Sequence, residues 1–293
     1  MLKEHAATTA TESSHGRMAL IFDFDLTLAP STLDALVRRC GMDPETWKRD
    51  RIEPLRMEGW DEILAKSYAL VRLSRSGDVR ITQDLVAEVG RNLEPYEGTL
   101  DMFESMRRTA REVAKDVNLE FYVVSSGLYD VMAATSIARD LDGLWGTKLH
   151  FDDQTGELDF PMLTVTHPEK VRYILALCKG LDPTGPNAPA HVYQDVPGYK
   201  WHVPLDQVIY AGDGSSDMAV FRFLHDRGGI ALGVYKSDQV EGWSGMEQVD
   251  PQRRVQNLAR TDYREGSELM QSLTLAVESI ARKIALRQLS RGE

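Results

Sequence analysis

Short runs of hydrophobic residues alternate along the chain with longer segments whose hydrophobic residues recur every three or four positions. The runs are typical of strands buried on both faces of a parallel sheet, and the longer segments are typical of amphipathic helices. Because the two kinds of segment alternate over most of the chain, we predict an α/β fold with a Rossmann-like, doubly wound parallel sheet. The four predicted strands are MALIFDF at 18–24, LEFYVVSSG at 119–127, DQVIYAG at 206–212 and GGIALGVY at 228–235.

The first two strands are separated by a segment that has only helical periodicity. This segment runs from 31 to 94, and we predict that it is a small helical domain inserted into a core made of 18–30 and 95–293. Residues 1–17 are polar and contain no hydrophobic signal sequence, so we expect a flexible N-terminal tail. Within the insertion, helix-breaking residues stand at Gly41, Pro44, Pro54 and Gly77.

The remaining segments of the core also have recognisable patterns. Alternation of hydrophobic and polar residues around a glycine-containing turn predicts a hairpin at 148–160. A Pro- and Gly-rich stretch at 181–204 predicts a surface excursion, whose function the sequence leaves open. Helical spacing predicts helices at 101–116, 128–141, 168–180, 218–226 and 266–289.

Composition and charge narrow the class of protein. The 293 residues are 42% hydrophobic and 27% charged, which is typical of a globular protein, and no hydrophobic run is long enough to span a bilayer. A net charge of -11 argues against nucleic-acid or anionic-membrane partners, which favour basic surfaces. Cys40 and Cys178 lack metal-ligand spacing, so we expect free thiols and a cytoplasmic location.

Polar clusters follow three of the predicted strands. DFDLT follows the first strand, SSG ends the second and GDGSSD follows the third, with Lys170 near the start of a helix. Because the carboxyl ends of parallel strands meet at one edge of the sheet, we expect Asp23, Asp25 and Asp213 to lie close together there. Three clustered carboxylates would raise one another's pKa, and a divalent cation such as Mg²⁺ would remove that repulsion.

The same edge carries groups that can bind phosphate. Ser125, the amide of Gly127 and Lys170 can donate hydrogen bonds to phosphate oxygens. One aspartate is then available as a nucleophile and its neighbour as an acid and base, which is a known arrangement in phosphoryl transfer. The sequence therefore predicts phosphate chemistry at this edge.

DFDLT, VVSSG, Lys170 and GDGSSD, in that order, resemble the four motifs of the haloacid dehalogenase-like phosphohydrolase superfamily. The resemblance covers 18–235 and is closest to the phosphoserine phosphatase-like branch, with 31–94 in the position of that superfamily's C1 helical cap. It implies a Mg²⁺-dependent phosphatase that hydrolyses a small phosphorylated metabolite through an aspartyl-phosphate intermediate.

The resemblance also implies a role for each motif residue. Asp23 would be the nucleophile and Asp25 the general acid and base. Mg²⁺ would be bound by Asp23, Asp213 and the backbone carbonyl of Asp25. The phosphate-binding residues would be Ser125, Ser126, Gly127 and Lys170, and the supporting residues Thr27, which positions Asp25, together with Gly212, Gly214 and Asp217.

Several alternatives stay open at this point. The same motifs are compatible with a phosphotransferase or phosphomutase, or with a non-catalytic binding protein that keeps the fold. Trp47, Trp60 and Tyr68 of the insertion either line a substrate pocket or pack between helices. True phosphoserine phosphatases carry a glutamate where this chain has Ser31 and Thr32, followed by Asp34, so we predict a different phosphometabolite. The oligomeric state is left open.

Overall fold

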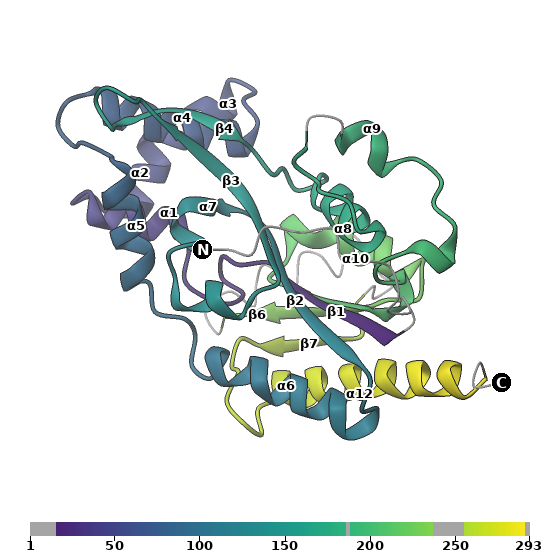
Figure 1. Ribbon diagram of the computed structural model, residues 1–293. Coiled ribbons are helices and arrows are strands. Elements are labelled where there is room, and N and C mark those ends of the chain that lie inside the picture. The colour runs from purple at the N-terminus through teal and green to yellow at the C-terminus, as the bar shows by residue number, and fades with distance from the viewer. Residues whose placement is uncertain (1–15, 186–187, 237–254, 291–293) are drawn as a thin grey trace.

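The computed structural model describes residues 16–185, 188–236 and 255–290, which form one sheet flanked by helices (Figure 1). In these ranges the sheet has seven strands in the order β4-β3-β2-β1-β5-β6-β7. Neighbouring strands are parallel except for β3 and β4, which are antiparallel. The prediction of a Rossmann-like α/β core is confirmed. The strands are β1 (Arg17–Phe22), β2 (Asn118–Leu128), β3 (Gly143–Phe151), β4 (Leu158–Leu163), β5 (Val208–Gly212), β6 (Ile230–Tyr235) and β7 (Asn257–Arg260).

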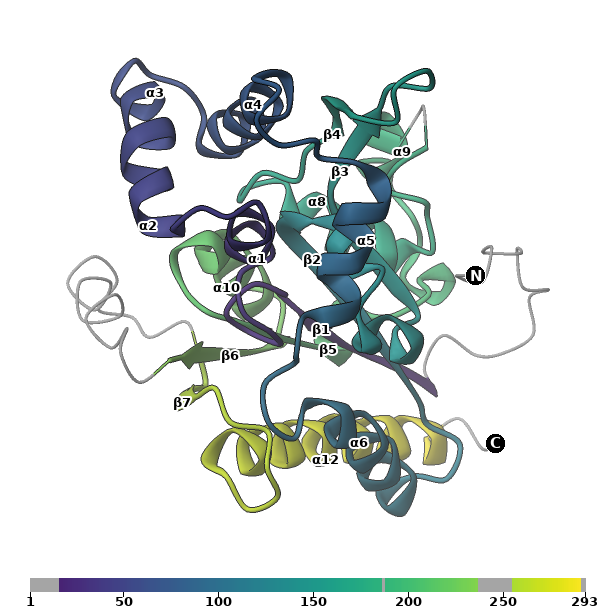
Figure 2. The same ribbon diagram turned by 90° about the vertical axis from the view of Figure 1, so that its left-hand side faces the viewer.

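Successive residues of β1 face opposite sides of the sheet, and each side is covered by a layer of helices (Figure 2). Leu20 and Phe22 join a buried hydrophobic cluster with α6 and α12. Ala19 and Ile21 join a second cluster with α8 and α10 on the other face. The central strand is therefore buried on both sides, which is why its sequence is continuously hydrophobic. The helices are α6 (Thr99–Val113), α12 (Glu268–Leu289), α8 (Lys170–Lys179) and α10 (Met218–His225).

The segment 32–92 after β1 is helical, and it lies beyond the carboxyl ends of the parallel strands (Figure 1). Its hydrophobic side chains form a third cluster, which also includes Leu149 and Leu158 of the β3–β4 hairpin. The hairpin extends from the sheet and packs against α4. The elements are α1 (Thr32–Arg39), α2 (Pro44–Trp47), the π-helical segment η2 (Lys48–Ile52), α3 (Glu53–Met57), α4 (Glu62–Arg75) and α5 (Gln83–Asn92).

The structure differs from the sequence-based prediction after β2. In place of one helix over 128–141 there is a single turn, α7 (Tyr129–Met132), and a short 3₁₀ segment, η3 (Ser136–Asp140). The Thr135 hydroxyl donates to the Met132 carbonyl at 2.7 Å, a side-chain contact that competes with continued helix. The hairpin strand β3 also begins earlier than predicted, because Gly143 already pairs with β2.

Two further segments have structure that we did not predict from the sequence. β7 is a four-residue strand at the edge of the sheet, too short to give a sequence pattern. The excursion at 181–204 contains α9 (Ala188–Val192) and a 3₁₀ turn, η4 (Gly198–Lys200). It is held to α8 by Lys179, whose ammonium donates to the carbonyls of Val192 and Gln194. The predicted tail lies outside the described residues up to 15, and β1 begins at Arg17, one residue before the predicted core.

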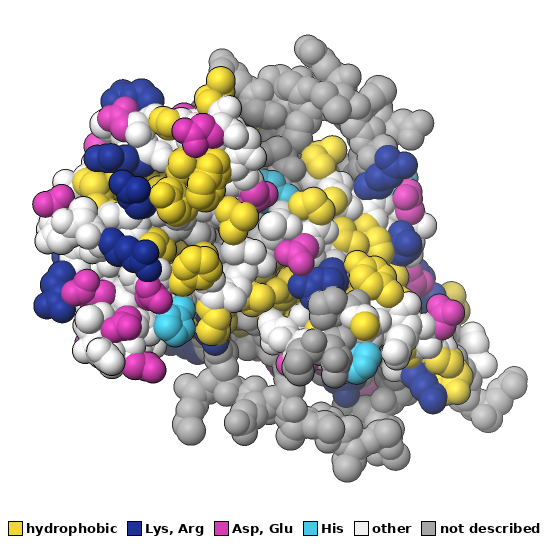
Figure 3. All heavy atoms as spheres, turned by 90° about the horizontal axis from the view of Figure 1, so that it is seen from above, with side chains coloured by type: hydrophobic (Ala, Val, Ile, Leu, Met, Phe, Trp, Pro, Cys, Tyr) yellow, Lys and Arg dark blue, Asp and Glu magenta, His cyan; other side chains and the backbone are white. Residues whose placement is uncertain are grey.

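The surface of the helical segment and its surroundings is mixed in character. On the face shown in Figure 3, positive and negative side chains are interspersed with hydrophobic ones, and neither charge covers the face alone. Among the described residues, no helix combines the length and the hydropathy that crossing a membrane requires.

Candidate active site

The loop that follows β1 begins with a buried ion pair. Asp23 is 4% exposed, and its backbone N–H donates to the Ala211 carbonyl of β5 at 2.9 Å. The Lys170 ammonium lies 2.9 Å from Asp23 Oδ2 and 2.7 Å from Asp217 Oδ1. Asp217 Oδ1 also accepts a hydrogen bond from the Tyr210 hydroxyl at 2.6 Å. The Lys170 side chain is fully buried, so these carboxylates and not solvent offset its charge.

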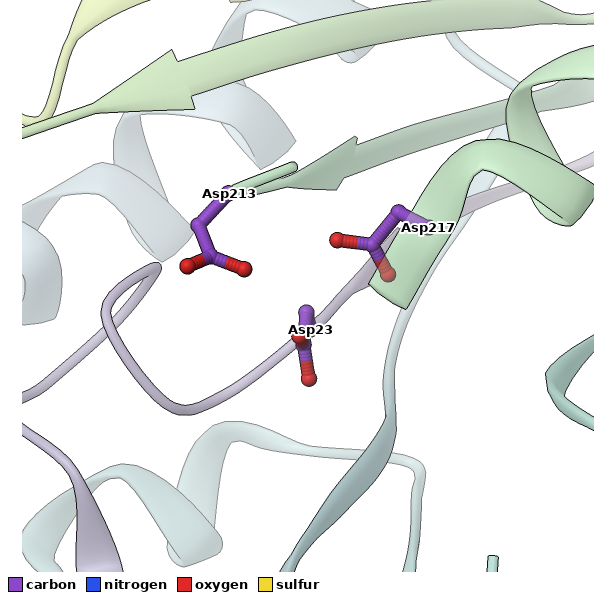
Figure 4. A group of neighbouring side chains, drawn as sticks. All are labelled: Asp23, Asp213 and Asp217. Atoms are coloured by element: carbon purple, nitrogen blue, oxygen red, sulfur yellow. The ribbon is translucent and has the colours of Figure 1, made fainter. Parts of the chain in front are cut away.

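The turn after β5 brings Asp213 and Asp217 next to Asp23, so that the three carboxylates face a common space (Figure 4). Oxygen atoms of the three groups lie within 4.8 Å of one another. Two glycines make this turn possible. A Cβ atom on Gly212 would lie 2.3 Å from Asp217 Oδ2 and would clash with it. Gly214 has a φ of 148°, a backbone conformation that residues other than glycine rarely adopt.

The carboxylates at this edge outnumber the cations that contact them. Burial and the charges of Asp23 and Asp217 raise the pKa of Asp213 to about 8, and burial also raises the pKa of Asp217. Burial opposes the charged form of Lys170, but the charges of Asp217 and Asp23 keep the pKa of Lys170 above its ordinary value. A divalent cation with a preference for oxygen ligands would offset the remaining negative charge, so the residues present fit Mg²⁺.

Asp25 is held by the start of α1. The Thr32 N–H donates to Asp25 Oδ1 at 2.9 Å, and its hydroxyl donates to Oδ2 at 3.1 Å. The first N–H groups of a helix lack partners within the helix, so they are available to a carboxylate. Burial raises the pKa of Asp25 to about 6, against the opposing effect of the Thr32 hydrogen bonds. Leu26, next to Asp25, has a φ of 60°, a strained conformation of the kind found at functional sites.

The structure changes the predicted role of Thr27. Its hydroxyl is buried and finds no hydrogen-bond partner among the described residues. Its carbonyl instead accepts a hydrogen bond from Tyr263 at 3.0 Å, which ties the loop to the segment before α12. The hydrogen bonds that hold the Asp25 carboxylate come from Thr32, whereas we had expected Thr27 to help position Asp25. From the sequence we placed Thr32 near the substrate and did not predict its contact with Asp25. The sequence does not determine at which residue α1 begins.

The end of β2 supplies the predicted phosphate-binding groups. Ser125 is 1% exposed, and its Oγ accepts a hydrogen bond from the Gly127 N–H at 3.1 Å. The Ser126 hydroxyl is buried without a hydrogen-bond partner in the described part of the chain. A Cβ atom on Gly127 would lie 3.0 Å from Asp25 Oδ1, so glycine permits the close approach of the two loops. The residues of DFDLT and VVSSG thus lie at the same edge of the sheet as Lys170 and GDGSSD.

A cavity of about 340 Å³ opens above this edge, between the strand ends and the helical segment. This volume is near the lower limit for ligand pockets, which indicates a small ligand. The cavity is lined on the sheet side by Asp23, Asp25, Ser125, Ser126, Gly127 and Asp213, and on the helical side by Ser31, Asp34, Glu45, Lys48, Glu62 and Lys66, among others.

The fold has counterparts among solved structures. A HAD-family hydrolase from Salmonella enterica serovar Typhi matches over 88% of this chain and 70% of its own, with a TM-score of 0.56 and 14% identity. A substrate-bound phosphoserine phosphatase matches over 88% of this chain and 98% of its own, with a TM-score of 0.53 and 16% identity. The chain has the haloacid dehalogenase-like fold.

The haloacid dehalogenase-like fold is shared with a further structure, a phospho-aspartyl intermediate analogue of phosphoserine phosphatase, at a TM-score of 0.51 and 16% identity over 88% of this chain and 98% of its own. An uncharacterised protein of Borreliella burgdorferi is 22% identical over 293 residues, covering 89% of this chain and 98% of that protein. No family model matches the chain. At these identities the likeness establishes the fold, and the chemistry has to be argued from the residues.

The aromatic residues of the helical segment do not line the cavity above the acids. Trp47 is buried, while Trp60 and Tyr68 stack with ring centroids 4.7 Å apart. All three line a separate cavity of about 710 Å³ between α2, α3 and α4. The sequence left open whether these three residues line a substrate pocket or pack between helices. Because they do not line the cavity above the acids, the structure favours packing between helices.

Proposed function

We propose that the protein is a Mg²⁺-dependent phosphatase that hydrolyses a small phosphomonoester through an aspartyl-phosphate intermediate on Asp23. The single observation that carries this proposal is the fully buried Lys170, which joins Asp23 to Asp217 beside a third carboxylate, Asp213. Burying an ammonium and several carboxylates without a role in chemistry would only reduce stability. The named structural relatives, a HAD-family hydrolase and phosphoserine phosphatases, support the same class of reaction.

In the first step, an Asp23 carboxylate oxygen attacks phosphorus while the bond from phosphorus to the leaving oxygen breaks. Lys170 offsets the negative charge that the phosphoryl group and Asp23 share. Asp25 gives its proton to the leaving oxygen, so an alcohol departs instead of an alkoxide. Thr32 holds both oxygens of Asp25, which fixes the direction in which the proton can be delivered.

In the second step, water attacks the phosphorus of the intermediate and Asp25 accepts its proton. The bond between phosphorus and the Asp23 oxygen breaks, which releases inorganic phosphate and restores the carboxylate. The Ser125 and Ser126 hydroxyls, which line the cavity, would donate to phosphoryl oxygens during both steps. The Gly127 N–H donates to Ser125 Oγ in the structure and would exchange that hydrogen bond for one to a phosphoryl oxygen.

The residues that would hold Mg²⁺ are Asp23, Asp213 and the backbone carbonyl of Asp25, with Asp217 holding Lys170. When bound, the ion would neutralise part of the charge on the phosphoryl group and on the carboxylates. The helical segment 31–94 would act as a cap that limits access of bulk water to the cavity. The absence of nucleic-acid partners and the cytoplasmic location stay predictions, and the oligomeric state stays open.

The test is hydrolysis of p-nitrophenyl phosphate, with Mg²⁺ and with EDTA, by the wild type and by Asp23→Asn. We expect Mg²⁺-dependent turnover that falls by about 10⁴-fold in Asp23→Asn, as for loss of an essential nucleophile. Asp101→Asn is the matched control, because Asp101 is an exposed aspartate in the first turn of α6. Equal turnover by Asp23→Asn and the wild type would refute the aspartyl-phosphate mechanism.

Phosphotransferase and phosphomutase activities use the same intermediate, so a separate measurement distinguishes them. Adding an alcohol acceptor would divert phosphoryl groups from water to the acceptor in a transferase. We expect release of inorganic phosphate to stay unchanged with the acceptor present. A non-catalytic binding protein would instead bind phosphate esters with no turnover in any variant.

A further inference from the structure

The turn over 24–29, which carries Asp25, is tight and strained. The Leu28 N–H donates to the Phe24 carbonyl at 2.9 Å, which closes the turn on itself. Leu26 has a φ of 60°, and such a conformation persists only where the surrounding structure holds it in place. Contacts from outside the turn therefore contribute to its shape.

Two successive carbonyls of this turn accept hydrogen bonds from distant parts of the chain. The Thr27 carbonyl accepts from the Tyr263 hydroxyl at 3.0 Å, and the Leu28 carbonyl accepts from the Tyr96 N–H at 2.9 Å. Tyr96 belongs to the connection between α5 and α6, through which the chain returns from the helical segment to the core. Tyr263 lies between β7 and α12. The turn is thus anchored to two separate segments.

Tyr263 is built rigidly into the core. It is 1% exposed, and its ring packs edge-on against Phe22 of β1 with centroids 6.4 Å apart. Its N–H donates to the Glu97 carbonyl at 3.1 Å, and its own carbonyl lies so close to Gly98 that a Cβ atom there would be 2.3 Å away. The ring and the backbone therefore place the hydroxyl, and the hydroxyl is the group that reaches Thr27.

Any effect of Tyr263 on the reaction has to pass through the turn. Tyr263 does not line the cavity of about 340 Å³, and it lies beyond 18–235, the range that the motif resemblance covers. Thr27, which it holds, is two residues from Asp25. A general acid works only in a fixed direction, so a small displacement of the turn would impair proton delivery.

We propose that Tyr263 is a positioning residue for the reaction: its hydroxyl holds the Thr27 carbonyl and thereby the turn from which Asp25 delivers its proton. This inference rests on the proposed phosphatase function and adds a residue that acts on the same site. Ser125 and Lys170 come from β2 and α8, so losing the hydroxyl should impair proton transfer more than the binding of the phosphoryl group.

The test compares two phosphate esters that differ in their need for an acid. p-Nitrophenyl phosphate and benzyl phosphate both carry one aromatic ring and are similar in size. p-Nitrophenolate is a weak base that leaves without a proton, whereas the benzyl alkoxide is a strong base that needs the proton of Asp25. The ratio of the two kcat/KM values does not depend on the fraction of folded protein, so partial unfolding of a variant would not change it.

Tyr263→Phe removes the hydroxyl and keeps the ring and the backbone contacts. We expect kcat/KM for benzyl phosphate to fall by about tenfold or more, and kcat/KM for p-nitrophenyl phosphate by less than about threefold. Tyr122→Phe is the matched control, because the buried Tyr122 hydroxyl donates to Glu120 Oε2 at 2.7 Å near the start of β2, away from the cavity. The ratio should be unchanged in the control. An equal loss with both esters in Tyr263→Phe, or no loss, would overturn the inference.

A double variant shows whether the effect passes through Asp25. In Asp25→Asn the general acid is already absent, so adding Tyr263→Phe should change the ratio of the two kcat/KM values by less than about twofold. A tenfold change of the ratio in this background would show that Tyr263 acts on a group other than Asp25, and the assignment would be wrong.

A separate outcome identifies failure of the proposed function. If the wild type hydrolyses neither ester, the phosphatase proposal fails; if it hydrolyses only p-nitrophenyl phosphate, that proposal stands. In both cases hydrogen exchange of a peptide that covers 24–29 decides the inference. We expect its amides to exchange about tenfold faster in Tyr263→Phe than in the wild type, and at the wild-type rate in Tyr122→Phe. Equal rates in Tyr263→Phe and the wild type would refute the inference.

Discussion

The substitution Lys170→Met tests whether the buried cation holds the acidic edge of the sheet together. Methionine has a similar length and no charge, so the variant removes the ammonium while filling most of its volume. Lys170 is fully buried between Asp23 and Asp217, and no described cation replaces it at these two carboxylates. The variant therefore leaves two buried carboxylates uncompensated whenever no metal is bound.

The magnitude follows from the two distances. At 2.9 Å and 2.7 Å, and an effective dielectric constant of about 20, each pair contributes roughly 6 kcal/mol of Coulomb attraction. Desolvation of the three groups offsets most of this attraction, and removing one partner of a buried pair costs about 3–5 kcal/mol in measured cases. We expect Lys170→Met to lower the free energy of unfolding by about 3–5 kcal/mol in EDTA.

The assay is urea denaturation of the wild type and Lys170→Met in EDTA, with Lys115→Met as the control at an exposed lysine. A second variant, Lys170→Met with Asp217→Asn, removes one of the two uncompensated charges and should recover part of the lost stability. A loss below about 1 kcal/mol in Lys170→Met, comparable to that of an exposed ion pair, would refute the reasoning. No recovery in the double variant would show that charge is not the cause.

Three further predictions concern other contacts. Thr32→Val removes the hydrogen bond from the Thr32 hydroxyl to Asp25, and we expect kcat for p-nitrophenyl phosphate to fall by about 10- to 100-fold. Thr27→Val is the control, and its effect on kcat should be smaller because the Thr27 hydroxyl makes no hydrogen bond to the described residues. Gly127→Ala places a methyl group 3.0 Å from Asp25, so activity should fall with little change in the melting temperature; full activity would contradict the close approach. Burial would raise the pKa of Glu120, but the hydrogen bond and charge of His202 lower it overall, so Glu120→Gln should be less stable by about 1–3 kcal/mol at pH 7. Because the folded pKa lies below the unfolded value, this difference should be full above about pH 5 and shrink as the pH falls below about 4.5 in denaturation series; a difference that grows toward acid pH would contradict the assignment.

The sheet core was predictable because its strands are buried on both faces. Continuous hydrophobic runs such as LEFYVVSSG gave β2, and the glycine after α8 correctly gave the end of that helix, where Gly180 has a φ of 71°. β7 was not predictable, because four residues at a sheet edge carry no period. The segment 128–141 was misassigned as one helix because the side-chain contact of Thr135 that ends α7 outweighs helical spacing.

The site was predictable in its residues but only partly in its contacts. Asp23, Asp213 and Lys170 could be placed together because strand ends converge, whereas Asp217 followed only from the resemblance. The structure adds the distances. The hydrogen bonds from Thr32 to Asp25 depend on where α1 begins, which a sequence fixes only to within a few residues.

Carboxylates outnumber ammonium groups at both ends of the cavity. At the strand ends, Asp23, Asp213 and Asp217 share one lysine, an excess of negative charge that attracts a divalent cation. At the helical end, Lys48 and Lys66 stand against three carboxylates, those of Asp34, Glu45 and Glu62. Because negative charge is in excess at both ends, the binding of a phosphoryl group would depend on Lys170 and on a bound divalent cation, which together offset the charge that the phosphoryl group brings.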